Sequence, residues 1–65
     1  TGQLDAAARE FHHAAARDAF AVEPRVGLVR VYLQQGKRDE ARKHYTILRQ
    51  LHPKDAEPLA HLFAS

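Results

Sequence analysis

The sequence predicts an all-α fold of antiparallel helix–turn–helix repeats, a fragment of an α-solenoid with about four helices. Two observations predict it. Apolar residues recur at steps of three and four along most of the chain, which is the spacing of one helix face. In addition, the segment GQLDAAAREF at residues 2–11 is echoed by GKRDEARKHY at residues 36–45. A fixed internal period indicates stacked copies of one supersecondary unit.

The offset between residues 2–11 and residues 36–45 also relates later parts of the sequence to each other, and the two copies align without a gap. The matched residues are turn formers and core types, which are the residues that a repeated fold must keep. The matched pairs are Gly2 and Gly36, Asp5 and Asp39, Ala7 and Ala41, Phe11 and Tyr45, Glu23 and Glu57, Pro24 and Pro58, and Leu28 and Leu62.

The first helix is expected from Leu4 to about Val22. Asp5 lies near its start and Arg17 near its end, which suits the helix dipole. Its apolar face consists of Leu4, Ala7, Ala8, Phe11, Ala14, Ala15 and Ala19.

The second helix is expected to begin at Pro24, because proline is favoured at the first helical position, where its missing N–H is not needed. The apolar positions then continue to Gln35, and Gly36 is typical of a helix C-terminus. The apolar face consists of Leu28, Val29, Tyr32 and Leu33.

The third helix is expected from Arg38 to Leu51 and is ended by Pro53. Asp55 is a good N-cap for a fourth helical segment, Ala56 to Ala64. The connections are only two to five residues long, so neighbouring helices must be antiparallel. The apolar positions are Ala41, Tyr45, Leu48 and Leu51 in the third helix and Leu59, Leu62 and Phe63 in the fourth.

This pattern resembles the tetratricopeptide repeat, a helix pair whose period equals the offset between the matched pairs. By this resemblance residues 22–55 are one complete repeat. Residues 1–21 look like the second helix of a preceding repeat, and residues 56–65 look like the first helix of a following repeat or a cap. The residues that carry the resemblance are Gly2, Ala7, Phe11, Leu28, Tyr32, Gly36, Ala41, Tyr45, Leu48 and Pro53.

Some positions depart from the family pattern. Val29 and Phe63 stand where the family usually has glycine or alanine at the closest helix contact, and Arg25 stands where a large aromatic residue is common. Ala19 replaces the proline that usually ends the second helix of a repeat, so the first helix is expected to run on toward Val22.

Composition sets the limits of the interpretation. At 65 residues the chain is one domain at most, and without cysteine it has no disulfide or thiolate metal site. The net charge of +2 neither requires nor excludes a nucleic acid partner. No apolar stretch approaches the ~20 residues that cross a bilayer, so no membrane partner is expected. The chain begins at Thr1, so we expect a piece of a longer protein, and cytoplasm and periplasm are both compatible.

The histidines do not predict a metal site. His12 and His13 are adjacent and point about 100° apart on a helix, so they cannot converge on one ion. We expect them, with His44 and His52, to be exposed single side chains, whereas His61 is a candidate for ligand contact. No nucleophile constellation or phosphate-binding glycine loop is present either, so neither enzyme activity nor a cofactor is expected.

The basic side of the third helix has two interpretations. Arg38, Arg42, Lys43 and Arg49 are expected to form a solvated repeat face. The alternative is an RNA-binding helical repeat, which is less favoured because the helix from Pro24 to Gly36 is too short for the pentatricopeptide pattern. No nucleic acid partner is therefore expected.

The resemblance implies a protein–protein interaction scaffold that binds a peptide or partner helix on the concave face of stacked helix pairs. The alternative is a structural or oligomerisation module without a dedicated ligand. A clamp for a terminal carboxylate is not expected, because Val26 and Ala60 occupy the candidate positions. Gly27 is expected to open space on the concave face. The expected concave residues are Val26, Arg30, Leu33, Gln34, Glu57, Ala60, His61 and Ala64.

The helices at both ends are expected to expose apolar surface, which would make the isolated chain form homodimers or swap helices. The surfaces concerned are Leu4, Ala8, Phe11 and Ala15 at one end and Leu59, Leu62 and Phe63 at the other.

Overall fold

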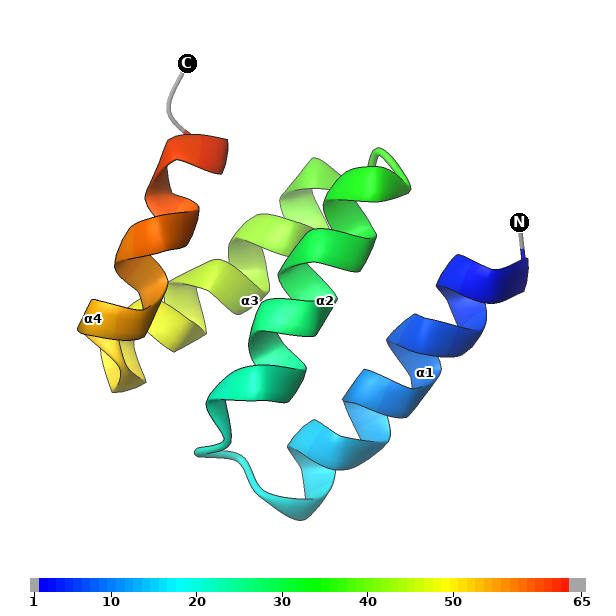
Figure 1. The fold of residues 1–65 in the computed structure, drawn as a ribbon, viewed down its shortest axis with the longest axis horizontal. Coiled ribbons are helices and arrows are strands. Elements are labelled where there is room, and N and C mark those ends of the chain that lie inside the picture. The colour runs from blue at the N-terminus through cyan, green and yellow to red at the C-terminus, as the bar shows by residue number, and fades with distance from the viewer. Residues whose placement is uncertain (1, 64–65) are drawn as a thin grey trace.

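The computed structural model describes residues 2–63 and is helical throughout this range apart from the turns. The elements in chain order are α1 (Gly2–Arg17), α2 (Val22–Gln34), α3 (Arg38–Leu51), α4 (Pro53–Ala56) and the 3₁₀ helix η1 (Glu57–Leu62). Figure 1 shows that no strand interrupts these helices in the described range. The predicted all-α class is confirmed.

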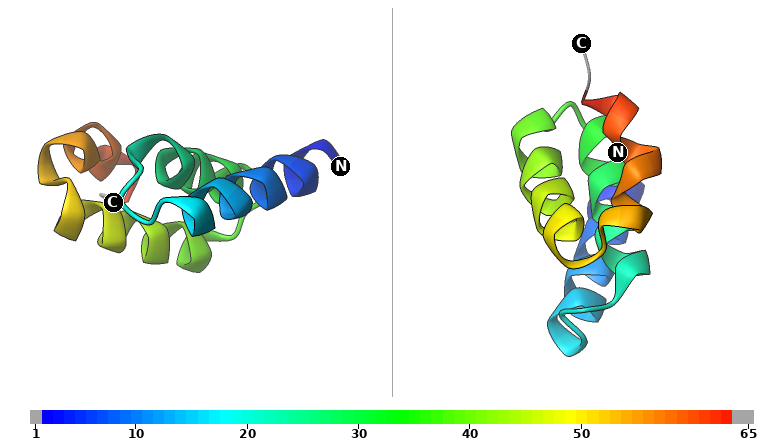
Figure 2. Two further views of the ribbon diagram at one scale, coloured as in Figure 1. Left: turned by 90° about the horizontal axis from the view of Figure 1, so that it is seen from below. Right: turned by 90° about the vertical axis from the view of Figure 1, so that its left-hand side faces the viewer.

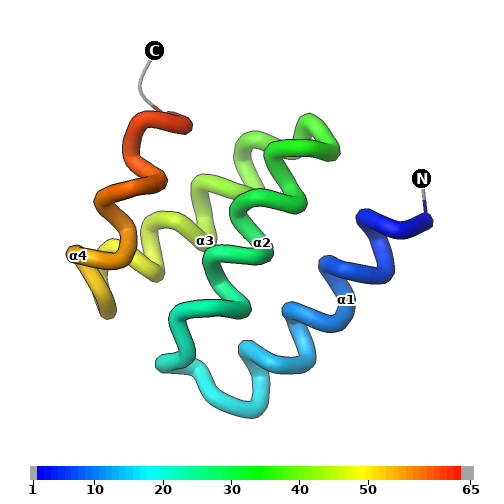
Figure 3. Tube along the Cα trace, viewed as in Figure 1, coloured from blue at the N-terminus to red at the C-terminus, as the bar shows by residue number. Residues whose placement is uncertain are grey.

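The helices alternate in direction along the chain. The trace in Figure 3 runs down α1, up α2, down α3 and up again through α4 and η1. The helix α2 lies between α1 on one side and α3 with α4–η1 on the other, and Figure 2 shows the flat side view of this arrangement. The molecule measures 30 × 30 × 15 Å.

Two apolar clusters hold the helices together, and α2 contributes to both. Leu28 and Val31 of α2 pack with Ala8 of α1. On its other side, α2 places Val29 in a cluster with four residues of α3, α4 and η1, namely Ala41, Leu48, Ala56 and Leu59. Leu28, Val29 and Leu48 are fully buried, and each such side chain contributes about 1.5–3 kcal/mol to stability.

The turn between α2 and α3 forms as the sequence predicts. Gly36 has a φ of 77°, in the left-handed region that side chains disfavour. The N–H of Lys37 donates to the carbonyl of Tyr32 at 2.8 Å, and the N–H of Gly36 donates to the carbonyl of Leu33 at 3.1 Å. These two bonds are the Schellman motif, which satisfies the last carbonyls of α2 and requires a glycine at this position.

Helix α1 ends at Arg17, so the expectation that it continues toward Val22 is wrong. The carboxylate of Asp18 accepts a hydrogen bond from the N–H of Phe20 at 3.1 Å, which favours a turn over a further helical turn. Helix α2 then begins at Val22, two residues before the expected Pro24. Pro24 still lies in the first turn, where its missing N–H has no helical acceptor to lose.

The start of the fourth segment also differs from the expectation. Helix α4 begins at Pro53, and Asp55 lies inside it rather than capping it. The fixed φ of proline suits the first helical position, so the residue that ends α3 also starts α4. From Glu57 to Leu62 the chain tightens into η1. The predicted end at Ala64 lies outside the described residues.

The close contact between α1 and α2 depends on Gly27. A Cβ atom at this position would lie 2.5 Å from Cζ of Phe11, so the ring occupies the space that a side chain would need. The expectation that Gly27 opens space on the concave face is therefore wrong, because it faces α1.

Two of the apolar residues expected to be exposed at the ends are buried. Ala8 is covered by α2, and Leu59 lies in the cluster of α2, α3 and α4. The large hydrophobic side chains that the described residues do expose are Phe20, Ile47 and Leu51. Self-association stays a prediction, as does the division into residues 1–21, 22–55 and 56–65.

Candidate functional site

A groove runs between α2 and η1, and we call it the α2–η1 groove. Its volume is about 370 Å³. Helix α2 contributes three side chains and η1 contributes four. The lining residues are Arg30, Leu33, Gln34, Pro58, Leu59, His61 and Leu62.

Helical spacing brings these side chains to one surface. Leu33 and Gln34 lie three and four residues after Arg30, so all three share one face of α2. In a 3₁₀ helix residues three apart eclipse each other, which places His61 directly over Pro58. The groove therefore depends on the tightening of η1 as well as on the period of α2.

The groove combines an apolar floor with a charged rim. Leu33 and Leu62 are half-buried and pack against the cluster of α2, α3 and α4. Arg30, Gln34 and His61 are exposed, and none of the acidic residues in the described part of the chain lines the groove. The arrangement can take an apolar side chain against the two leucines and a carboxylate against the guanidinium group of Arg30.

The residues predicted to lie on the concave face are found in several different places in the structure. Arg30, Leu33, Gln34 and His61 line the α2–η1 groove together. Val26 is half-buried and packs against the core cluster. Glu57 is exposed outside the lining, Ala60 lines a different pocket, and Ala64 lies outside the described residues.

Ala60 belongs to a second cavity of about 300 Å³ between α3 and η1, which we call the α3–η1 pocket. Two aromatic rings in the lining of this pocket, those of Tyr45 and Phe63, are stacked with their centroids 4.8 Å apart. The lining residues are Arg42, Tyr45, Thr46, Arg49, Ala60 and Phe63.

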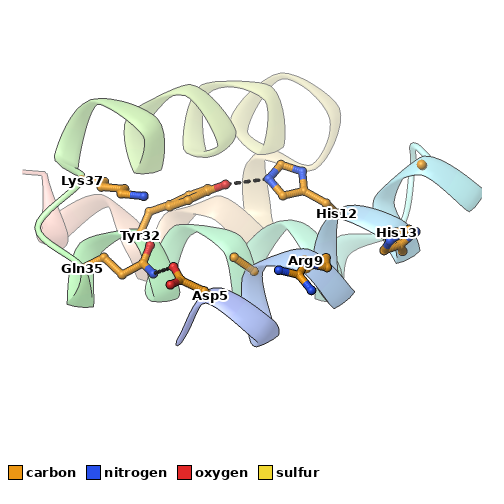
Figure 4. Close-up of a pocket in the computed structure, with 9 residues that line it drawn as sticks. Asp5, Arg9, His12, His13, Tyr32, Gln35 and Lys37 are labelled. Carbon is orange, nitrogen blue, oxygen red and sulfur yellow. Dashed lines mark hydrogen bonds between the residues drawn. The ribbon is translucent and has the colours of Figure 1, made fainter. Parts of the chain in front are cut away.

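A third cavity, of about 650 Å³, lies between α1 and the end of α2, and Figure 4 shows it from the side. The side-chain amide of Gln35 donates to the carboxylate of Asp5 at 2.7 Å across this cavity. The ring of His12 is hydrogen-bonded to the hydroxyl of Tyr32 at 2.6 Å. These bonds tie α1 to α2, so the cavity is bordered by contacts that hold the fold.

Three aromatic rings meet beside this cavity. The ring of His44 stacks on Tyr32 with centroids 5.7 Å apart, and it meets His12 edge-on at 5.5 Å. Arg25 reaches the same ring, with its guanidinium nitrogen 3.5 Å from Nδ1 of His44, and also donates to the carbonyl of Ala19 at 3.2 Å. The cluster joins α1, α2 and α3.

Burial lowers the pKa of His44, and the nearby His12 and Arg25 lower it further against a smaller opposing effect of Glu40. Burial also raises the pKa of the Tyr32 hydroxyl, with a contribution from Glu40. His44 and His52 are both half-buried, so the expectation of exposed side chains is wrong for these two histidines. Nε2 of His52 is hydrogen-bonded to the carbonyl of Phe20 at 2.7 Å. No sequence pattern identifies the cluster, since its members lie on three different helices.

Other kinds of site were tested on the described residues. Among residues 2–63, no group of three or more His, Cys, Asp or Glu side chains is placed to hold a metal ion. None of the described helices combines the length and apolar composition that a bilayer crossing requires.

Comparison with known proteins gives one match. The model of the tetratricopeptide repeat family matches residues 1–64. No curated protein and no solved structure matches the chain.

Proposed function

Because the chain belongs to the tetratricopeptide repeat family, whose helical repeats act in general as non-catalytic protein-interaction modules, we propose that it binds an extended segment of a partner protein in the α2–η1 groove. In this family stacked helix pairs offer a continuous surface to a partner. The α2–η1 groove is the cavity that lies between the first helix of the central pair and the helical segment that follows it.

One observation carries the proposal. Arg30, Leu33 and Gln34 share a groove with His61, which lies far from them in the sequence. A partner segment lying across α2 and η1 would contact all four side chains together. Such a segment would bury half-exposed leucine surface, which is the usual source of favourable free energy in peptide binding.

The groove chemistry defines the partner segment. Leu33 and Leu62 favour an aliphatic side chain, and Arg30 favours a carboxylate beside it. We therefore expect an acidic segment with an aliphatic residue next to an aspartate or glutamate. His61 stands on the η1 side of the groove and adds a hydrogen-bonding group at the rim.

The test compares two variants of the chain with one matched control. Binding of a short peptide with leucine flanked by aspartates is measured by NMR titration of backbone amides. Arg30→Gln and Leu33→Ala should each weaken binding about fivefold or more, since each removes one of the side-chain groups that the peptide contacts. Arg17→Gln removes the same charge as Arg30→Gln, but from α1, and should leave binding unchanged.

Two results would contradict the proposal. The peptide could shift amides outside α2 and η1, or Arg17→Gln could weaken binding as much as Arg30→Gln, which would indicate an unspecific charge effect. A chain that binds no acidic peptide at all would favour the structural or oligomerisation module.

A further inference from the structure

The α3–η1 pocket is lined by Ala60 and Phe63, neither of which lines the groove described above, and it has a different charge. Two arginines line it, Arg42 and Arg49, and among residues 2–63 no aspartate or glutamate does. The α2–η1 groove has one arginine in its lining. The α3–η1 pocket is therefore the more strongly basic of the two cavities.

A third arginine lies next to the pocket. The guanidinium carbons of Arg38 and Arg42 lie 5.6 and 5.8 Å from the ring centroid of Phe63. The ring attracts each cation, but two like charges one helical turn apart repel each other. An anion in the pocket would relieve this repulsion, since no acidic side chain lines the pocket to do so.

The positions of Arg42 and Arg49 suit a ligand between them. They lie seven residues apart on α3, which is about 10 Å along the helix axis. Tyr45 and Thr46 lie between them on the pocket wall. Long flexible side chains approaching from both ends can place two guanidinium groups on one oxyanion.

We propose that the α3–η1 pocket binds a phosphate group carried on a phosphorylated side chain of a partner protein. A phosphorylated side chain has a charge of about −1.5 to −2 at neutral pH, which matches the two lining arginines. Guanidinium groups bind phosphate oxygens through paired N–H donors, so arginine is the residue that best suits such a ligand. A pocket of about 300 Å³ has room for the group and its attachment to a chain.

A nucleic acid fits the pocket less well than a phosphorylated protein. Single-stranded nucleic acids are bound by stacking bases on aromatic rings as well as through phosphates. Here Tyr45 and Phe63 stack on each other, and Phe63 also carries the two guanidinium groups of Arg38 and Arg42. The rings are therefore already engaged and offer little surface to a base.

The test uses the whole chain and two peptides of glycine and serine that differ in one phosphate. Backbone amides are followed by NMR during titration with each peptide, with inorganic phosphate as a further probe. We expect saturable shifts in residues 42–49 and 60–63, and binding of the phosphorylated peptide at least about fivefold tighter than that of its unphosphorylated copy. Equal binding of the two peptides would overturn the proposal.

Variants then assign the site. Arg42→Gln and Arg49→Gln should each weaken phosphopeptide binding about fivefold, and Arg42→Lys should weaken it less because the charge stays while the paired donors are lost. Both arginines are exposed, so circular dichroism should show unchanged helicity, and either variant suffices if the other fails to fold.

Two control variants also replace one arginine with glutamine, but outside the α3–η1 pocket. Arg17→Gln on α1 and Arg30→Gln in the α2–η1 groove should leave phosphopeptide binding unchanged. The second control also separates this proposal from the proposed function, because Arg30→Gln should weaken only the binding of the peptide with leucine flanked by aspartates. If Arg17→Gln weakened phosphopeptide binding as much as Arg42→Gln, the assignment of the site to the α3–η1 pocket would be wrong. If a short oligouridylate bound more tightly than the phosphopeptide, the proposal of a protein partner would be wrong.

Discussion

Two helix junctions in this chain occupy equivalent places in the repeat but differ in the residues that fill them. At the first, α1 meets α2 through Leu4, Ala8 and Phe11. At the second, α3 meets η1, and the residues at the equivalent positions are Arg38, Arg42 and Tyr45.

The first junction is packed at its centre, and the cavity of about 650 Å³ lies beside this contact, between α1 and the end of α2. Ala8 is buried against Leu28 and Val31, and the ring of Phe11 lies against the backbone of Gly27. At the second junction the equivalent of Gly27 is His61, which is exposed, and the equivalent of Ala8 is the exposed Arg42. An open pocket remains there, because arginines keep their charged groups in water rather than in a packed interface.

The difference shows that the period and the packing are separate properties of the sequence. Matching glycines, prolines and alanines set where each helix lies. The residue types at the contact then decide whether a junction closes as part of the core or stays open to a ligand. The first junction contributes to stability, and we expect the second to contribute mainly to binding.

The strongest test of this difference is a matched pair of leucines, Leu28 and Leu62. Leu28 is fully buried, so Leu28→Ala should lower the free energy of unfolding by about 2–5 kcal/mol. Leu62 occupies the equivalent place and is half-buried, so Leu62→Ala should lower it by about 1 kcal/mol. Urea denaturation measures both values. Equal losses would show that the two junctions contribute equally to stability.

Gly27 and His61 give a second matched pair. In Gly27→Ala the new methyl group overlaps the ring of Phe11, which costs about 1–3 kcal/mol, while the better helix propensity of alanine offsets about 1 kcal/mol. His61→Ala should change stability by less than about 0.5 kcal/mol. Thermal unfolding followed by circular dichroism would measure both changes. A stabilised Gly27→Ala variant would mean that the two helices are not in close contact.

The His12, Tyr32 and His44 cluster predicts that stability depends on pH. The pKa of His44 is lowered in the folded state, so this side chain binds a proton less readily there than in the unfolded chain, where the pKa has its ordinary value of 6.5. Stability is therefore fully present above pH 6.5 and is lost as the pH falls through 6.5 toward the lowered pKa. The second junction has Thr46 in the place of His12 and should add no such dependence.

The measurement is the urea midpoint between about pH 7.5 and 5, in the original chain and in His44→Gln. The variant should lose less stability on acidification than the original chain. Identical slopes would exclude His44 as the cause.

Self-association is the smallest effect that we expect. Of the apolar side chains predicted to drive it, Ala8 and Leu59 are buried, which leaves less surface for a second copy. The exposed Phe20 and Leu51 offer the remaining apolar area. Sedimentation equilibrium should detect dimers only at high concentration, and a species of 7.3 kDa at every concentration would contradict the prediction.

The sequence predicted the helices and their order because the constant offset between matched residues fixes them together. It also predicted that Gly36 terminates α2, since few other residues adopt a positive φ at a helix end. The helix boundaries were less predictable. Asp18 forms the turn after α1 through its hydrogen bond to the N–H of Phe20, and Pro53 takes the first position of α4, and neither feature follows from the period of the apolar residues.

The candidate sites were predictable only along one helix. The spacing of Arg30, Leu33 and Gln34 placed them on one face of α2, whereas Ala60 faces α3 because η1 is a 3₁₀ helix. A tighter helix turns each residue by a different angle, so a face assigned from the α-helical period does not hold there. The cluster at His44 depends on how three helices pack, which spacing within one helix does not determine.

The contrast in central packing between the two junctions is tested most directly by the two rings at equivalent positions, Phe11 and Tyr45. The free energy of unfolding of Phe11→Ala and Tyr45→Ala is measured in urea under the same conditions. Both rings are half-buried. We expect a loss of about 3 kcal/mol for Phe11→Ala, whose ring fills the space beside Gly27, and about 1–2 kcal/mol for Tyr45→Ala, whose ring lines the α3–η1 pocket. Equal losses, or a larger loss for Tyr45→Ala, would contradict the conclusion that the α3–η1 junction is the less closely packed at its centre.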